Sequence, residues 1–560
     1  MGRKKTIFFI CLALLFFCAT ASHAFGYEGG GAHGRRLAVW LLAQTHLWFA
    51  AFILAVPIFV LILEFTGHIK KDGRYDRVAY EFMRVSTTAY SLTAITGVVF
   101  AAALFLFYPA LMGYMGKVFK PTYFVYILLF VLENVFLYAY YYGWERMTGR
   151  LKPLHLLLGL GLNVSGTSIM FIANAWTSFM MSPAGVNGSG EFTGNLWQAI
   201  TNPFWMPLNV HRLIANVAFG GSIVAAYAAY RFLSAEGREE KAHYDWMGYT
   251  ANFVSILSLL PLPFAGYWLT AEIYAYSQQM GITLMGGAFG WMFVVQAVLI
   301  GALFLSANYY LWCGLSRRRG GERYVPYIKY IAFFIGGAFL VWFTPHTPAM
   351  TPSELSAIGS QYHPILGPLG IMPAKNIAVN AIILFTFLSF LLYWRSGSVI
   401  TASWAWYGKL AQAAVFAAAL VNIMFLGVYY GYFTNTVYKV ASSVPQVVMS
   451  LVAIGVCAII EFLMHRGAEE EAVQWGNVPE RSQYALVLLA VSFTWLMGLM
   501  GFIRSAIRED WHIYAVLKDT SPDAFTPTIA YATRTVSIGT IVFMGLIVFI
   551  FWLNRPQGKS

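Results

Sequence analysis

The chain has few charged residues. Only 11% of its 560 residues are Asp, Glu, Lys or Arg, whereas 59% are hydrophobic and 17% are aromatic. Soluble globular domains carry about 25% charged residues, so this composition excludes them. The apolar runs reach about 20 residues or more, which suits helices that cross a hydrocarbon layer, whereas strands of a membrane barrel would alternate over about ten residues. The sequence therefore predicts an all-α, polytopic integral membrane helix bundle.

Cysteine is also scarce. Of the four cysteines, Cys11 and Cys18 lie in the N-terminal apolar run, and Cys313 and Cys457 stand alone in apolar surroundings. We therefore predict no disulfide and no iron–sulfur cluster, and the lack of a C-x-x-C-H motif excludes a covalently attached c-type haem. Any haem must be held by coordination alone. The sequence also has no internal repeat, low-complexity tract or soluble domain.

The N-terminus is typical of a secretory signal peptide over residues 1–24. Arg3, Lys4 and Lys5 precede an apolar run, and Ser22-His23-Ala24 offers a cleavage site of small residues. An uncleaved anchor is the alternative. About thirteen spanning helices are expected after it. They are 37–65, 85–108, 122–142, 154–176, 209–232, 246–267, 289–313, 327–343, 376–394, 406–429, 444–464, 484–502 and 535–552.

The charge distribution predicts that the mature N-terminus lies outside. With that orientation, the segments assigned inward carry about twice as many Lys and Arg as the outer ones, as the positive-inside rule expects. The net charge of +12 is then explained by a basic cytoplasmic face beside anionic lipid. The sequence gives no reason to expect a nucleic-acid partner.

Several histidines fall at one predicted membrane level, near the outer face. His46 lies inside the first apolar helix and His211 at the start of the fifth, followed by Arg212. Ionisable groups inside a membrane are costly unless they are paired or bind a ligand, which favours a functional reading of these residues. Imidazole is a common iron ligand, and a guanidinium binds carboxylates such as haem propionates. The structural alternative for the His211–Arg212 pair is that both side chains simply extend to the membrane–water interface.

Other polar residues are more ambiguous. His346, His363 and His512 sit in outer loops, and each on its own is more often an ordinary loop residue. Arg504 and Arg508, just outside the twelfth span, could bind propionates or lipid phosphates equally well.

Glu133 lies in the middle of the third span, in FVYILLFVLENVFLYAYYYGW. A carboxyl group at that depth must be protonated, paired or hydrated, since a lone ion costs at least about 2.5 kcal/mol. We favour a role in a proton path. The structural alternative is a neutral acid that is hydrogen-bonded to a neighbouring helix. Asn163, Asn174 and Asn216 fit the simpler role of amides that join helices.

Four stretches of the first five helices resemble subunit I of the cytochrome bd quinol oxidases. They are THLWFAAFILAVP around His46, FVLENVFLYAYYYGWER over 130–146, LNVSGTSIMFIANAW over 162–176 and NPFWMPLNVHRLIANVAFGG around His211. The resemblance implies that His46 ligates the active-site haem, that His211 ligates a low-spin b haem and that Glu133 belongs to the proton path. Met372, in LGIMPAKNIAV, is the candidate second ligand of the low-spin haem, with His346 or His363 as alternatives.

The rest of the chain departs from that family. The acidic motif of the family's quinol loop is replaced by PLPFAGYWLTAEIYAY, which keeps only Glu272, and its Gly-Arg-Gln-Pro-Trp box is replaced by IREDW over 507–511. The expected haem-ligating glutamate becomes Ser505 and a second proton-path acid becomes Val125. The chain also has more spans than the roughly nine of the family subunit. These departures weaken oxygen reduction more than haem binding.

These observations predict a haem-binding subunit of a respiratory electron-transfer complex, with an enzymatic activity of the quinol oxidase type. It would oxidise a membrane quinol and pass electrons through b-type haem, two or more in number, to oxygen or to a partner cytochrome of the c type. A haem d is a further candidate cofactor, and the expected protein partners are a second membrane subunit, a cytochrome of the c type, or both. The chain would comprise the signal peptide, haem-binding helices over 35–233 and a divergent membrane region over 234–560. The competing hypotheses are a haem-free transporter or proton pathway, and a haem-free anchor of a redox complex.

Overall fold

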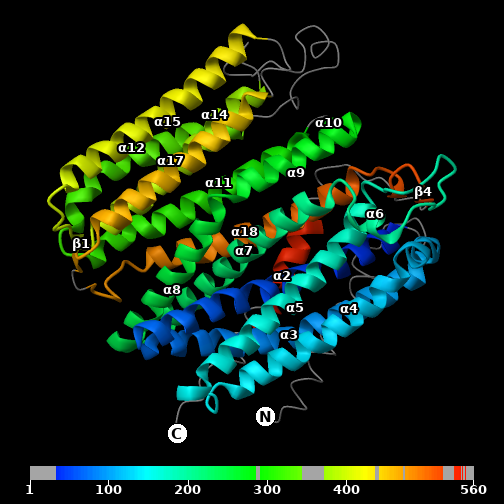
Figure 1. The fold of residues 1–560 in the computed structure, drawn as a ribbon, viewed down its shortest axis with the longest axis horizontal. Coiled ribbons are helices and arrows are strands. Elements are labelled where there is room, and N and C mark those ends of the chain that lie inside the picture. The colour runs from blue at the N-terminus through cyan, green and yellow to red at the C-terminus, as the bar shows by residue number, and fades with distance from the viewer. Residues whose placement is uncertain are drawn as a thin grey trace. The chain divides into compact units, whose positions relative to one another are not determined.

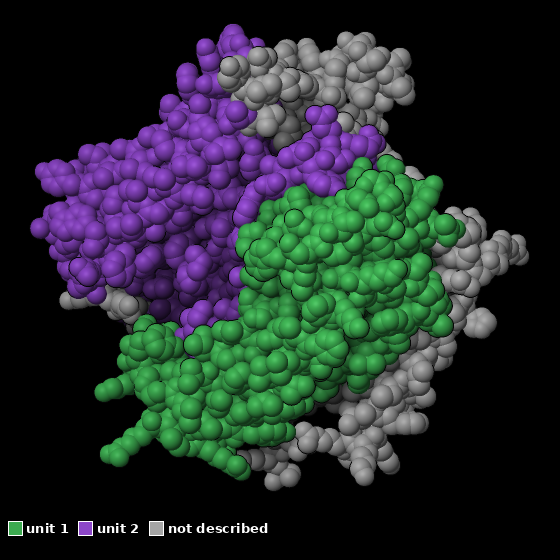
Figure 2. Space-filling view, turned by 45° about the vertical axis from the view of Figure 1, so that its right-hand side comes forward, with its two compact units in different colours: residues 1–57, 64–209, 497–560 green, residues 58–63, 210–496 purple. Residues whose placement is uncertain are grey.

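The computed structural model describes residues 33–285, 290–343, 371–434, 441–470, 473–520, 535–543, 545–546 and 549. The chain divides into two compact units, which Figure 2 shows in green and purple. Unit 1 consists of Met1–Pro57, Glu64–Asn209 and Met497–Ser560, and unit 2 consists of Ile58–Leu63 and Val210–Leu496. Each unit is described by itself.

The predicted all-α membrane fold is confirmed. Within the described residues, twelve helices are long and apolar enough to cross a membrane. They match the first twelve predicted spans, while the thirteenth, 535–552, falls partly outside the described residues, as the signal peptide does entirely. The division of the sequence at residue 233 stays a prediction.

The helices of the first half are α2 (His33–Lys70), α3 (Gly73–Phe107), α4 (Pro109–Gly143), α5 (Lys152–Phe179), α6 (Leu196–Ile200), α7 (Trp205–Ser234), α8 (Arg238–Leu259), α9 (Leu262–Tyr276) and α10 (Gln278–Met285). The later ones are α11 (Gly290–Cys313), α12 (Val325–Trp342), α14 (Ile371–Arg395), α15 (Ala405–Phe433), α17 (Ser443–Met464) and α18 (Arg481–Ala506). Short 3-10 turns cover Gly149–Leu151, Gly314–Arg317 and Gly321–Tyr324. Two small antiparallel ladders pair β1 (Ser398–Val399) with β2 (Glu469–Glu470), and β3 (Trp511–Ile513) with β4 (Leu517–Lys518).

Unit 1 is built on α2 to α5, and α4 and α5 run side by side (Figure 1). Pro109 and Pro153 stand in the first turns of α4 and α5, where a missing backbone N–H costs nothing. Pro57 lies inside α2, and its carbonyl accepts a hydrogen bond of 3.1 Å from Asn163 Nδ2 on α5. This bond joins two helices by an amide, as the sequence predicted for Asn163.

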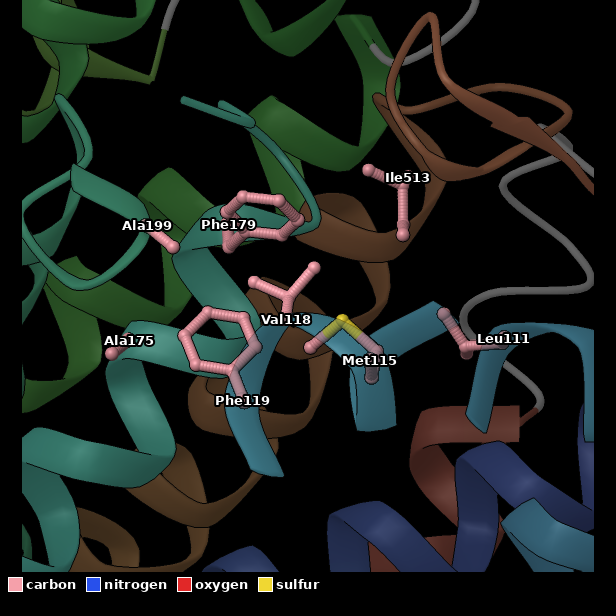
Figure 3. Close-up of a cluster of buried hydrophobic side chains, with 8 residues drawn as sticks. All are labelled: Leu111, Met115, Val118, Phe119, Ala175, Phe179, Ala199 and Ile513. Atoms are coloured by element: carbon pink, nitrogen blue, oxygen red, sulfur yellow. The ribbon is translucent and has the colours of Figure 1, made fainter. Parts of the chain in front are cut away.

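One end of unit 1 is closed by a cluster of apolar side chains from α4, α5, α6 and β3. Figure 3 shows its members, which are Leu111, Met115, Val118, Phe119, Ala175, Phe179, Ala199 and Ile513. The backbone N–H of Tyr514 also donates to the carbonyl of Met180, at 2.9 Å. The β3–β4 hairpin is therefore attached to this end, which we call the hairpin end. At the opposite end, the C-terminus of α2 meets the N-termini of α3 and α5. We call this the basic end, because it carries Lys70, Lys71, Arg74, Arg77 and Lys152.

Unit 2 contains a bundle in which α14 packs against α12, α15 and α17 (Figure 1). Its helices are also joined by buried ion pairs. Arg317 and Asp245 are fully buried, and Arg317 Nε donates to Asp245 Oδ2 at 2.8 Å. Arg395 on α14 pairs with Glu461 on α17 at 2.9 Å. Buried charges of this kind are tolerated because each one is neutralised by a partner.

Candidate functional site

His46 lies on α2, with its imidazole held against α3. Its Nδ1 is 3.2 Å from the carbonyl of Thr93 and 3.4 Å from Thr96 Oγ1. Since a carbonyl can only accept, Nδ1 carries the proton, which leaves the lone pair on Nε2. No described residue forms a hydrogen bond with Nε2. This is the arrangement of a metal-binding histidine, whose second nitrogen is oriented by a backbone carbonyl.

The neighbouring residues of α3 fit the ring closely. The ring of Phe100 stacks on the imidazole, with centroids 6.2 Å apart. At position 97, a Cβ would lie 2.9 Å from His46 Cε1, so any larger residue would have to displace the ring. Thr93, Thr96, Gly97 and Phe100 thus define one orientation of the imidazole.

His211 lies in the first turns of α7, in unit 2, and faces Gly266 of α9. A Cβ at position 266 would lie 3.6 Å from both Cδ2 and Nε2 of the ring. The described residues provide no hydrogen-bond partner for this imidazole, so its donor chemistry also suits a metal. Arg212 follows it directly in the helix.

The second ligand predicted for His211 cannot be assigned from side-chain geometry. Met372 belongs to the first turn of α14, but its side chain lies outside the described part of the chain, as do His346 and His363. Met372 and His211 belong to unit 2 and His46 belongs to unit 1. The prediction that these residues share one membrane depth stays a prediction.

Glu133 is buried in unit 1, with a residue exposure of 6%. The hydroxyl of Tyr90, on α3, donates to Glu133 Oε2 at 3.4 Å, and Asn134 Nδ2 donates to the same hydroxyl at 2.7 Å. Gly166 of α5 gives the carboxyl its space, because a Cβ there would lie 2.9 Å from Oε1. The carboxyl is therefore hydrogen-bonded across helices, and this geometry suits either the proton path or the structural alternative.

A second buried carboxyl, Glu64 on α2, lies near the basic end. Its Oε1 is 2.7 Å from Lys152 Nζ and 2.5 Å from His155 Nδ1, both on α5. Its Oε2 accepts a hydrogen bond from the hydroxyl of Tyr140 on α4. Lys152 also pairs with Asp76 of α3, at 3.0 Å. These five residues, which we call the Glu64 cluster, join all four long helices of unit 1.

The Glu64 cluster is a group of candidate functional residues that the sequence analysis missed. The predicted spans 37–65 and 154–176 include Glu64 and His155, and the sequence analysis singles out neither residue. The available signal was that both are ionisable residues within apolar stretches, as Glu133 is. Sequence alone could not pair them, because they are far apart along the chain.

The hairpin end of unit 1 gathers basic side chains. Arg508 Nη1 donates to the carbonyl of His512 at 2.6 Å, and burial, together with the nearby charges of Arg504 and Arg36, lowers the pKa of Arg508 to about 9. Arg504 Nη1 is buried with no hydrogen-bond partner in the described structure. Such a cluster suits an anionic group, as the sequence indicated for Arg504 and Arg508.

His512 contributes to local packing at the hairpin end. Its ring lies edge-on to Tyr108, with centroids 4.6 Å apart, and its Nε2 is 3.5 Å from Asp519 Oδ1. This placement fits the ordinary loop role that the sequence favoured.

These residues belong to a multi-pass helical membrane protein, and they include two histidines whose chemistry suits a metal and two buried carboxyl groups, Glu64 and Glu133. The model of the family described as cytochrome bd terminal oxidase subunit I matches residues 35–307. The resemblance read from the sequence is therefore confirmed for this part of the chain, and the match extends beyond the first five helices.

Two curated relatives come from Bacillus subtilis (strain 168). The putative cytochrome bd menaquinol oxidase subunit I is 25% identical over 199 residues, which are 35% of this chain and 44% of that protein. The cytochrome bd ubiquinol oxidase subunit 1 is 24% identical over 248 residues, 43% of this chain and 51% of that protein. The chain thus spans about half the length of the curated relatives it matches. Among solved structures, the bd oxidase from Geobacillus thermodenitrificans aligns at 17% identity with a TM-score of 0.42, over 77% of this chain and 98% of that one.

Proposed function

We propose that the chain is the haem-binding subunit of a membrane-bound quinol oxidase, which takes electrons from a membrane quinol and passes them through b-type haem to oxygen. The family match over residues 35–307 supports the class of activity. The observation that carries the proposal is the geometry of His46, whose Nδ1 is held by Thr93 while Nε2 has no partner among the described residues. A histidine oriented in this way is prepared to bind iron.

In this proposal, His46 would hold one haem through Nε2, and His211 and Met372 would together hold a second. When bound, the haems supply electron transfer and oxygen chemistry, and the protein sets their position and potential. Arg212 contributes a charge beside His211 that suits a propionate. Gly97 keeps α3 from displacing the His46 imidazole.

Proton supply is the other requirement of the reaction. Quinol oxidation releases protons and electrons together, and reduction of oxygen to water consumes an equal number of each. Glu133 is the buried group that would deliver protons, with Tyr90 and Asn134 holding its carboxyl in place. The protein would lie in the bacterial cytoplasmic membrane with its N-terminus outside, together with a second membrane subunit. A c-type cytochrome is the alternative electron acceptor.

Absorbance spectroscopy tests the haem assignment. Purified protein should show a reduced-minus-oxidised spectrum of b-type haem. His46→Ala and His211→Ala should each remove a different part of that spectrum, because each would remove one ligand. His68→Ala is the matched control, since His68 is an exposed histidine at the end of α2. The absence of any b-type spectrum in the wild type would exclude a haem-binding function.

Oxygen uptake tests the electron acceptor. Membranes given reduced quinol should consume oxygen, and the two histidine variants should lose that activity. Zero uptake by a wild-type protein whose haem is still reduced by quinol would exclude oxygen as the acceptor and favour a partner cytochrome.

A further inference from the structure

Tyr140 of the Glu64 cluster and Glu133 lie on nearly the same buried face of α4 in unit 1. Tyr140 of the cluster follows Glu133 by seven positions on α4, which is about two helical turns, or about 10 Å along the axis. Seven positions return to nearly the same helix face, and both residues are buried there.

We propose that the Glu64 cluster is the point at which protons are taken up from the basic end of the protein and loaded for transfer to Glu133. This inference rests on the proposed oxidase function, in which Glu133 delivers protons for oxygen reduction. To the proton path through Glu133, the inference adds Asp76, Lys152, Glu64 and His155 as uptake residues. It also adds Asn163 as an intermediate residue between them and Glu133.

The exposure of the cluster falls steadily from the surface inward. The Asp76 side chain is 41% exposed, that of Lys152 is 9% exposed, and those of Glu64 and His155 are fully buried. The contacts along this series are 3.0 Å from Asp76 to Lys152, 2.7 Å from Lys152 to Glu64 and 2.5 Å from Glu64 to His155. A proton taken from water at Asp76 therefore has an unbroken series of polar contacts into the membrane.

The geometry of His155 makes the inner end of this series a site that holds a proton. Its Nε2 is 2.8 Å from the carbonyl of Tyr140, so Nε2 must be the donor. Its Nδ1 faces Glu64 Oε1, and a contact of 2.5 Å between these two atoms requires a proton between them. The proton belongs either to the imidazole or to the carboxyl, and moving it needs no change of either side chain. Lys152 and the Tyr140 hydroxyl stabilise the carboxylate when the proton leaves it.

Asn163 lies on α5 between His155 and Gly166, the glycine that borders Glu133 Oε1. Its Nδ2 is occupied by the carbonyls of Pro57 and Gly159, at 3.1 and 2.8 Å. Its Oδ1 is buried and has no hydrogen-bond partner in the described structure. A buried acceptor of this kind costs about 1–3 kcal/mol if it stays unsatisfied, and it suits a hydrogen bond to water.

Asn163 is also well placed along α5. It lies two turns beyond His155 and about one turn before Gly166, whose missing Cβ makes room for Glu133 Oε1. Leu137, buried on α4 between Tyr140 and Glu133, cannot carry a proton. The amide oxygen of Asn163 is therefore the acceptor that a water-borne proton would use between the cluster and Glu133.

The experiment compares two rates in membranes that contain the intact complex. The first is quinol-driven oxygen uptake, which needs proton delivery, and the second is anaerobic reduction of haem by quinol, which does not. Glu64→Gln should lower oxygen uptake by about a hundredfold, the scale of a lost proton-transfer group, while haem content and anaerobic haem reduction stay at wild-type values. Glu64→Asp should restore part of the uptake.

Variants of surface residues distinguish a loss of proton transfer from a defect in folding. Asp76→Asn should lower oxygen uptake less than Glu64→Gln, and added acetate should restore it, because a soluble carboxylic acid can replace the lost surface group. Asp72→Asn is the matched control, since Asp72 lies at the same end and pairs only with Arg74 among the contacts of the described residues. It should leave both rates unchanged, with and without acetate.

Three results would overturn the inference. Wild-type oxygen uptake in both Glu64→Gln and Asp76→Asn would exclude proton transfer through the cluster. A parallel loss of haem, haem reduction and oxygen uptake, with no effect of acetate on Asp76→Asn, would assign the cluster a purely structural role that joins the four helices. A wild-type protein that contains reducible haem but consumes no oxygen would instead refute the oxidase function itself, and this is measured before any variant.

Discussion

Substitution of Gly97 by alanine tests the assignment of His46 with one added methyl group. The new Cβ would lie 2.9 Å from His46 Cε1. Carbon atoms pack best at about 3.5–4.0 Å, so the imidazole must retreat by about 0.6–1.1 Å or rotate away. Either movement changes the direction of Nε2 and strains the bond of 3.2 Å from Nδ1 to the Thr93 carbonyl.

The expected effect is large on haem binding and small on folding. Overpacking of this kind costs about 1–3 kcal/mol of stability, partly offset by the better helix propensity of alanine. A ligand displaced by about 1 Å can cost about a hundredfold in rate, so oxygen uptake should fall to about one hundredth. The spectral contribution of the haem held by His46 should decrease, while that of the haem held by His211 remains.

The assay is the reduced-minus-oxidised spectrum of the purified variant, together with its carbon monoxide difference spectrum and quinol-driven oxygen uptake. Gly116→Ala is the matched control, because nothing lies within 4 Å of a Cβ at that position of α4. If Gly97→Ala keeps the wild-type spectra and activity, His46 is not a haem ligand and the reasoning from its hydrogen bonds is wrong.

Three further predictions follow from buried groups. Glu133→Gln should leave the haem spectrum unchanged and lower quinol-driven oxygen uptake by about a hundredfold, as loss of a proton-transfer group does; unchanged uptake would leave Glu133 with a structural role. Asp245→Asn should destabilise unit 2 by about 3–5 kcal/mol, because it leaves the fully buried Arg317 without its counter-charge; thermal unfolding in detergent measures this, and a wild-type midpoint would contradict it. Burial lowers the pKa of His512 below its ordinary value of 6.5, although the charge of Asp519 opposes this shift, so the unfolded chain binds a proton more readily than the folded one. The stability of the hairpin should therefore be complete above pH 6.5 and decline as the pH falls through the lowered pKa. Amide exchange over residues 511–518 should speed up in acid, and a rate of local opening that does not depend on pH would exclude this linkage.

Hydropathy predicted the fold well because each spanning helix is determined by its own residues. The first twelve predicted spans are all present, although their ends shift. The second span was predicted to start at residue 85, but α3 begins at Gly73, with Asp72 capping its first turn. The third was predicted to start at residue 122, but α4 begins at Pro109 and continues through Pro121. Polar first turns and internal prolines reduce the local apolar signal without ending a helix.

The sequence predicted the candidate site only in part. His46, His211 and Glu133 stand out in the sequence because an ionisable residue within an apolar run is costly and needs an explanation. Their partners do not stand out, since Thr93, Gly97 and Tyr90 are common residues on a membrane helix. Only the packing of α2, α4 and α3 makes them the residues that orient the imidazole and the carboxyl.

The sequence by itself determined that the chain is a membrane helix bundle, which residues are too polar for their surroundings, and which family its first half resembles. Composition and local periodicity are sufficient for these conclusions, because burial in lipid acts on each segment separately. The tertiary structure alone decided that Glu64 meets His155, although ninety-one positions separate them, and that the amide oxygen of Asn163 is buried without a hydrogen-bond partner among the described residues. These contacts depend on how four helices pack together, and no local pattern of residues encodes that.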